Sequence, residues 1–129
     1  MLKATFPSGT YYIGDPSYVV RGEEGYHWIE SVWSHFYNGN KGCIEVNGVK
    51  LFLHSSYEGD GVFDGFFVDS GCIAVIKIDD LLDDNRFNFK NFNIRGTKFI
   101  KFDHDFEIIY DNGLFKIGKQ IIINTNLSE

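Results

Sequence analysis

Apolar residues along the chain fall mainly in short runs separated by Gly, Pro, Asn and Asp. This spacing is typical of β-rich folds, in which strands of a few residues alternate with tight turns. In the first two thirds of the chain it predicts strands at 2–6, 10–13, 18–20, 43–46, 49–53, 66–68 and 72–78. The stretch 55–65 is rich in glycine and acidic residues, and it is expected to be a loop.

The C-terminal third continues the pattern and predicts a β-meander. Its expected strands are 97–102, 106–110, 114–117 and 120–124, joined by turns at 103–105, 111–113 and 118–119. The clearest hairpin lies earlier, where Asn47-Gly48 separates the strands 43–46 and 49–53. Asn-Gly suits the two positive-φ positions of a type I′ turn, which joins two strands directly.

One segment has a helical period instead. Ile29, Val32, Trp33 and Phe36 recur at i, i+3, i+4 and i+7, which places them on one face of an amphipathic helix near 25–37. No repeat, linker or shift of composition divides the chain, so residues 1–129 are expected to form a single domain. We expect a mainly β (α+β) fold, an antiparallel barrel-like or sandwich sheet that carries this one helix.

Composition favours a compact core, because 43% of the residues are hydrophobic and 17% are aromatic. These values exclude an intrinsically disordered chain. The longest wholly apolar run, Cys72–Ile76, is far shorter than the ~20 residues of a membrane helix. Pro7 and Gly9 interrupt any signal-peptide core, so we expect a cytoplasmic protein without membrane contact. Cys43 and Cys72 lie in apolar runs and are expected to be buried free thiols.

The net charge of −6 conceals an uneven distribution. The segment 85–102 contains no acidic residue, and its basic residues are Arg86, Lys90, Arg95, Lys98 and Lys101. Because the rest of the chain is strongly acidic, long nucleic acids are not expected as partners. A small anion held at one basic face is compatible with this distribution. Phenylalanines interleave with these cations and would either stack on a nucleotide-like ligand or face the core.

Three polar blocks combine an acidic residue with residues that favour tight turns. They are Gly14-Asp15-Pro16, Gly59-Asp60-Gly61 and Val68-Asp69-Ser70-Gly71. With their neighbours, these blocks resemble a set of small uncharacterised bacterial and phage proteins that carry GDPxY, GDGx[FY] and VDSGxI in the same order. The resemblance implies a phage or mobile-element origin, and it implies no activity.

We expect the three blocks to converge on one small-molecule site, with the basic segment supplying charge complementarity. The candidate ligand-binding residues are Asp15, Tyr18, His54, Ser56, Glu58, Asp60, Asp69, Ser70, Arg86, Arg95 and Lys98. The carboxylates of Glu58, Asp60 and Asp64 would suit Ca²⁺ or Mg²⁺, but their spacing is not that of an EF-hand. Local hydrogen bonding within the loop is the favoured interpretation, and we expect no metal and no cofactor.

A hydrolase would need a serine beside His54. Ser55 would point to the opposite face of an extended strand, whereas Ser56 would share the face of His54. No Gly-x-Ser-x-Gly elbow is present in the sequence. Catalysis by His54 with Ser56, or by paired carboxylates, therefore ranks below binding.

The sequence thus predicts a non-enzymatic protein that sequesters a small anionic, nucleotide-like signalling ligand. The main alternative is an acidic inhibitor of a host defence protein, and its masking surface would consist of Asp60, Asp64, Asp79, Asp80, Asp83 and Asp84. The small hydrolase is the second alternative. The β-prone segment 120–124 is expected to pair internally or across a homo-oligomer interface, since an open apolar edge promotes aggregation.

Overall fold

The computed structural model of the chain describes residues 1–15, 42–46, 49–57, 59–68, 71–78 and 98–126. Within these ranges the chain forms eleven strands. They are β1 (Leu2–Phe6), β2 (Gly9–Gly14), β3 (Gly42–Val46), β4 (Val49–Ser55), β5 (Gly61–Phe63), β6 (Phe66–Val68), β7 (Cys72–Lys77), β8 (Lys98–Phe102), β9 (Phe106–Asp111), β10 (Leu114–Ile117) and β11 (Ile121–Asn124). In these ranges no helix is long and apolar enough to span a membrane.

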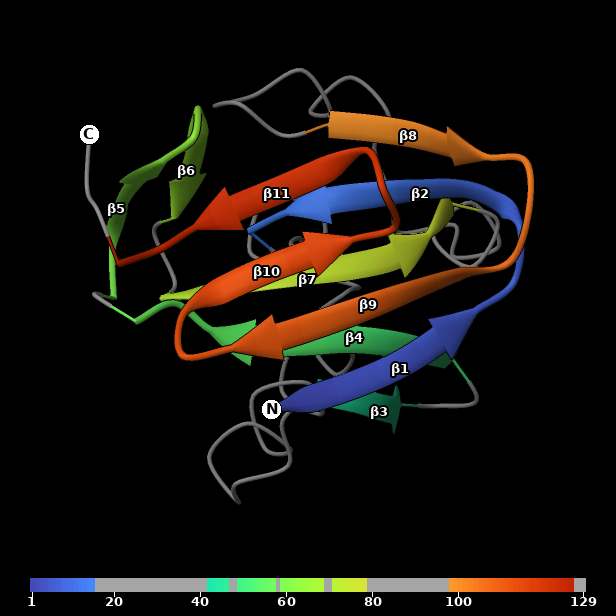
Figure 1. Ribbon diagram of the computed structural model, residues 1–129, viewed down its shortest axis with the longest axis horizontal. Coiled ribbons are helices and arrows are strands. Elements are labelled where there is room, and N and C mark those ends of the chain that lie inside the picture. Colours follow the sequence, from blue (N-terminus) through green and yellow to red (C-terminus); the bar gives the residue numbers. More distant parts are fainter. Residues whose placement is uncertain (16–41, 47–48, 58, 69–70, 79–97, 127–129) are drawn as a thin grey trace, which may run out of the picture.

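The strands form two larger sheets that lie face to face (Figure 1). One sheet has the order β1-β9-β10-β11, the other has the order β3-β4-β7-β2-β8, and β5 and β6 form a separate hairpin. All paired strands are antiparallel. Neither sheet closes on itself in the described part of the chain, so the mainly β prediction is confirmed as a sandwich. The helix predicted near 25–37 lies outside the described residues.

The two sheets differ in how their faces are buried. In β10 and β11, buried and more exposed residues alternate, as expected when one face packs on the core and the other meets solvent. In β7 the whole run from Cys72 to Ile76 is buried, and Leu51 and Leu53 on the neighbouring β4 are fully buried as well. The central strands β4 and β7 of the five-stranded sheet are thus buried on both faces, which explains their continuous apolar segments, whereas the edge strands β3 and β8 carry exposed residues.

The chain crosses between the two sheets at two adjacent places, which together form the corner of the sandwich. Residues 7–8 join β1 to β2, and residues 103–105 join β8 to β9. Phe6 pairs with Phe106 on one side of the bend, and Gly9 pairs with Phe102 on the other. The Ser8 N–H donates a hydrogen bond of 3.1 Å to Asp105 Oδ1, which links the two crossings directly.

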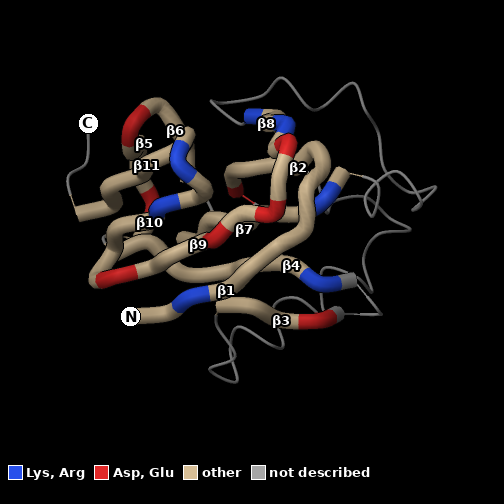
Figure 2. The backbone as a smooth tube through the Cα atoms, turned by 45° about the vertical axis from the view of Figure 1, so that its right-hand side comes forward, with Lys and Arg blue, Asp and Glu red and all other residues tan. Residues whose placement is uncertain are grey.

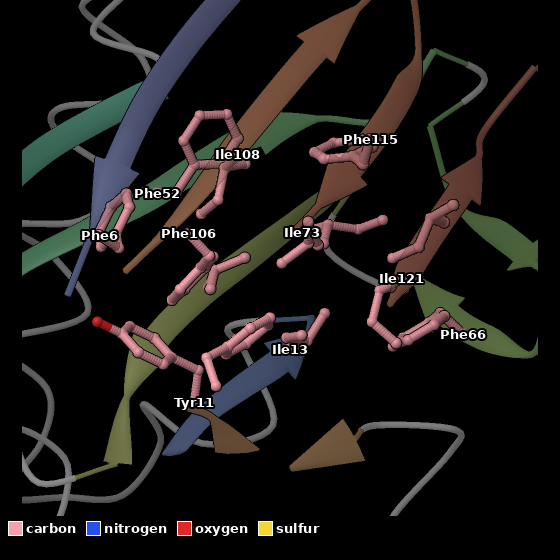
Figure 3. Close-up of a cluster of buried hydrophobic side chains, with 14 of the residues drawn as sticks. Phe6, Tyr11, Ile13, Phe52, Phe66, Ile73, Phe106, Ile108, Phe115 and Ile121 are labelled. Carbon is pink, nitrogen blue, oxygen red and sulfur yellow. The ribbon is translucent and has the colours of Figure 1, made fainter. Parts of the chain in front are cut away.

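Aromatic rings fill the inside of the corner (Figure 3). Phe102 and Phe106 stack at 3.7 Å with an interplanar angle of 11°. Tyr11 meets the ring of Phe106 edge-on at 4.9 Å, and its hydroxyl donates to the Pro7 carbonyl at 2.8 Å. Phe6 completes the group, stacked on Phe106 at 6.1 Å. The corner is therefore an aromatic, tightly packed end of the molecule.

On each flank of the sandwich, a lysine ammonium lies over an aromatic ring and links two parts of the fold. On one flank, Lys50 Nζ of β4 donates to the Thr5 carbonyl at 2.9 Å and lies 4.6 Å from the Phe6 ring centroid. On the other flank, Lys98 Nζ lies 5.3 Å from the ring centroid of Phe66 in the β5–β6 hairpin. Each contact combines a cation–π attraction with packing of the lysine stem.

Three sequence predictions need correction. The loop expected at 55–65 contains β5, which pairs with β6 through the turn Asp64-Gly65, whose φ values are +50° and +87°. This is a two-residue hairpin with the Asp-Gly chemistry of a type I′ turn. The expected meander is limited to β9, β10 and β11, because β8 crosses the corner and pairs with β2. Cys43 is exposed rather than buried, since β3 is an edge strand; Cys72 is buried as predicted.

The corner can be tested at Gly118, in the turn between β10 and β11. Gly118 has φ +59°, and a Cβ added there would lie 2.8 Å from the Phe102 ring. We expect Gly118→Ala to lower the free energy of unfolding by about 2–4 kcal/mol, from left-handed strain plus displacement of a packed ring. Gly65→Ala is the control, because it carries a similar strain but meets no atom within 4 Å, and it should cost only about 1 kcal/mol. The measurement is urea denaturation of both variants. Equal losses of unfolding free energy would show that contact with Phe102 adds nothing to the cost of Gly118→Ala.

Candidate functional site

The end of the sandwich opposite the corner, here called the polar end, gathers parts of the three sequence blocks. Gly14 of β2 lies opposite Ala74 of β7, and Ser55 of β4 lies opposite Cys72, so these strands reach the same margin of the sheet. Ser56 follows β4, and its N–H donates to the Gly71 carbonyl at 2.9 Å. Lys98 pairs with Ile13 and begins β8 at this end.

The buried polar side chains of the described ranges also lie at the polar end: Asp15, Ser56 and Thr125. The Ser56 hydroxyl donates to the Gly59 carbonyl, and the Thr125 hydroxyl donates to the Gly113 carbonyl at 2.5 Å. The Asp15 carbonyl accepts a 2.6 Å bond from the Tyr12 hydroxyl. In the described residues no buried side-chain nitrogen or oxygen lacks a partner. These bonds hold loops and strand ends together, which is the local role that acidic and hydroxyl side chains often have in turns.

His54 faces the interior of the polar end. Its ring stacks on Tyr110 of β9 with centroids 3.5 Å apart, and its Nδ1 lies 3.0 Å from the Ser55 carbonyl oxygen. The Ser55 hydroxyl is 3.4 Å from the same Nδ1, so the expectation that Ser55 points away from His54 was wrong. Ser56 donates its proton to Gly59 instead. The described geometry therefore does not assemble the proposed His54–Ser56 pair.

The other candidate residues are divided between exposed positions and undescribed ones. Asp60 is exposed, and its Oδ1 lies 3.8 Å from where a Cβ at Gly71 would stand. Lys98 is exposed and lies over Phe66. Six of the candidates lie outside the described residues: Tyr18, Glu58, Asp69, Ser70, Arg86 and Arg95. Across the described ranges, no three His, Cys, Asp or Glu side chains are grouped so as to hold a metal ion.

A groove of about 550 Å³ lies at the corner, on the outer face of the four-stranded sheet. The turn 103–105 forms one wall, the turn 118–120 forms the other, and outward-facing residues of β9 and β10 form the floor. Its lining residues are Phe102, Asp103, His104, Asp105, Phe106, Glu107, Ile109, Lys116, Gly118, Lys119 and Gln120. A volume of this size is within the range of small-molecule sites.

Some charged side chains of the groove already have partners in the protein, and others do not. Glu107 pairs with Lys3 at 3.8 Å, and Asp105 accepts the Ser8 N–H. Lys116 and Lys119 form no ion pair with any described residue. Figure 2 shows the contrast along the backbone, where the charges of β9 are acidic and those of β10 are basic. Two lysines are thus available to an anion in the groove, which is also lined by three acids: Glu107 is paired with Lys3, Asp105 accepts the Ser8 N–H, and Asp103 forms no ion pair with a described residue.

These groove residues were not among the sequence candidates. His104 and Lys119 occupy turns, and Lys116 alternates outward on β10, which is the usual arrangement of solvent-exposed residues. The groove exists because β10 pairs with β9, with Ile117 opposite Ile108, and brings the turn after β10 beside the corner. The pairing of β9 with β10 belongs to the predicted meander, but no local signal in the sequence indicates that the chain crosses between the sheets at 103–105 and brings that turn beside residues 118–120.

The comparisons with known proteins add no relative. No family model matches the chain, and no curated protein or solved structure matches it.

Tyr110 provides a test of the packing at the polar end. Burial, together with the charge of Asp111, raises the pKa of its phenol above 10.0, although a hydrogen bond involving the Gly113 backbone opposes this. A raised folded-state pKa contributes stability that is fully present below pH 10 and is lost as the pH rises further. We expect the unfolding free energy of the wild type to fall more steeply above pH 10 than that of Tyr110→Phe, measured by urea denaturation between pH 8 and pH 11.

Tyr57→Phe is the matched control, because the Tyr57 side chain is 66% exposed. Wild type and Tyr57→Phe should share one pH profile. Parallel curves for wild type and Tyr110→Phe over the whole range would contradict a phenol held protonated by burial.

Proposed function

We propose that this chain is a non-enzymatic binding protein that holds a small anionic molecule in the corner groove. The observation that carries the proposal is the pair Lys116 and Lys119, which face the groove without an ion-pair partner in the described chain. Their ammonium groups would receive a phosphate or carboxylate. Gln120 and His104 add hydrogen-bonding groups at the two walls.

The floor of the groove suits the uncharged part of such a ligand. Ile109 is half-buried there, and the edges of Phe102 and Phe106 reach the lining from the core. A groove that offers apolar contact together with a few charged groups is the usual form of a site for organic anions. A nucleotide-like signalling ligand, as the sequence suggested, combines these two chemical parts.

The groove is also suited to binding without catalysis. Its walls are turns held by structural bonds: Ser8 to Asp105 on one side, and the Gly118 N–H to the Glu107 carbonyl, 2.9 Å, on the other. Walls that are fixed before binding reduce the entropy lost when the ligand is held. Sequestration needs only this, since the ligand is retained and not transformed.

A protein partner is the second candidate, and one observation favours it. At the polar end, Tyr57 is 66% exposed and Phe67 is 39% exposed, near the exposed carboxylates of Asp60 and Asp64. Exposed aromatic rings beside acidic groups suit a basic surface on another protein. This candidate places the functional surface at the end of the molecule away from the groove.

Native mass spectrometry of the protein purified from cells distinguishes these sites. We expect an additional bound mass of roughly 200–500 Da, consistent with the groove volume. The double variant Lys116→Gln/Lys119→Gln should lose this mass while remaining folded, because both lysines are exposed. Asp60→Ala is the control at the polar end and should retain it.

Titration with adenosine 5′-monophosphate supplies a direct measurement. We expect binding that weakens with added salt and at least about tenfold weaker binding by the double variant, as expected for loss of two charge-assisted contacts. Binding unchanged in the double variant but lost in Asp60→Ala would move the site to the polar end. An empty protein that also fails to bind the nucleotide would contradict the small-ligand proposal and favour the protein partner.

A further inference from the structure

The two walls of the corner groove carry charges of opposite sign. The turn between β8 and β9 carries Asp103 and Asp105 on one wall, and the turn between β10 and β11 carries Lys119 on the other. The floor adds Glu107 and Lys116. Because acids outnumber lysines in this lining, a ligand with negative charge alone would be attracted by one wall and repelled by the other. The lining therefore favours a ligand whose two ends differ in chemistry.

Asp103 is the acid of the groove that forms no ion pair or hydrogen bond with a described residue. The other two acids are engaged, Asp105 by the Ser8 N–H and Glu107 by Lys3. Asp103 is also exposed, so its carboxylate is accessible to a ligand. Because an ionised carboxylate only accepts hydrogen bonds, this wall requires N–H or O–H donors on the ligand.

The floor between the walls suits a flat ring. Ile109 is half-buried there and lies opposite Lys116 in the pairing of β9 with β10. Phe102 and Phe106 also reach the lining. A ring lying on these apolar groups can present one edge to the wall of Asp103 and direct its charged substituent to the lysines.

Guanine has the edge that fits a carboxylate best among the common purines. Its N1–H and its exocyclic amino group are adjacent donors, and they can bond in parallel to both oxygens of one carboxylate. Hypoxanthine keeps the N1–H but lacks the amino group. Adenine presents an unprotonated N1 at the same position, and a carboxylate repels its lone pair. Asp103 would therefore favour guanine over both.

We infer that the groove binds a guanine nucleotide, with the phosphate at Lys116 and Lys119 and the edge of the base at Asp103. The inference rests on the proposed function, because it assigns the same two lysines to the anion. It adds the residue that recognises the base. It also explains why a groove that takes an anion keeps an acid without a partner among the described residues.

Isothermal titration calorimetry with guanosine 5′-monophosphate and inosine 5′-monophosphate tests the inference, since these nucleotides differ only in the amino group. We expect the wild type to bind the guanine nucleotide at least about tenfold more tightly, the effect of one more hydrogen bond to a charged group. Asp103→Asn should remove most of this preference, because a carboxamide replaces one acceptor oxygen by a donor. Its fold should persist, since Asp103 is exposed; the melting curve checks this.

Glu107→Gln is the matched control. It removes the same charge from the same groove, at an acid that pairs with Lys3, and it should retain the preference for guanine. Equal binding of the two nucleotides by the wild type would overturn the inference while the binding proposal stands. A preference that persists in Asp103→Asn, or is lost equally in Glu107→Gln, would overturn it in the same way. If neither these nucleotides nor adenosine 5′-monophosphate bind, the proposed function fails as well.

Discussion

The stacked pair of Phe102 and Phe106 sets the architecture of this protein. The two rings stand on either side of a bend at which the chain leaves one sheet and enters the other, and their 3.7 Å contact fills the inside of that bend. Tyr11 and Phe6, from the second crossing, pack against the same pair. With the corner filled in this way, the turn 103–105 stands above the outer face of the four-stranded sheet. The groove is the space between this turn and the one after β10, so its position follows from the packing of the core.

Polarity changes along the length of the sandwich. The corner is aromatic, whereas Asp15, Ser56 and Thr125 lie buried at the other end, where strand ends and loops need hydrogen-bond partners. Between the two ends, Lys50 over Phe6 and Lys98 over Phe66 fasten the flanks. Several polar groups that the sequence singles out thus form hydrogen bonds within the fold. The Ser56 hydroxyl, for example, donates to the Gly59 carbonyl. Lys116 and Lys119, which form no ion pair with a described residue, lie instead on the outer face. A binding site is better formed by charged groups that do not already bond to other groups of the protein.

Local chemistry accounts for what the sequence could predict. The strands 2–6, 66–68 and 114–117 agree with the structure residue for residue, because alternating apolar positions and turn residues define them within a few positions. The hairpin at Asp64-Gly65 was missed although Asp-Gly carried the signal, since glycine and acidic residues on either side resembled an irregular loop. The partner of β8 and the groove were beyond reach for a different reason. Both depend on pairings between distant segments, and alternation along one strand does not identify the strand beside it.

The hydrogen bond between Ser8 and Asp105 joins residues 97 positions apart. β1 pairs only with β9, and β2 pairs with β8 and β7, so β1 is without its only neighbour and β2 is without one of its two neighbours until most of the chain has been synthesised. On the ribosome, β1 and β2 therefore remain without these partner strands until residues near the C-terminus have been synthesised. Such non-local closure slows folding relative to folds built from neighbouring segments. Any truncation before Phe106 would remove the stacked pair of rings at the corner. It would also leave β1 and β2 without these partner strands and exposed to pairing with other chains.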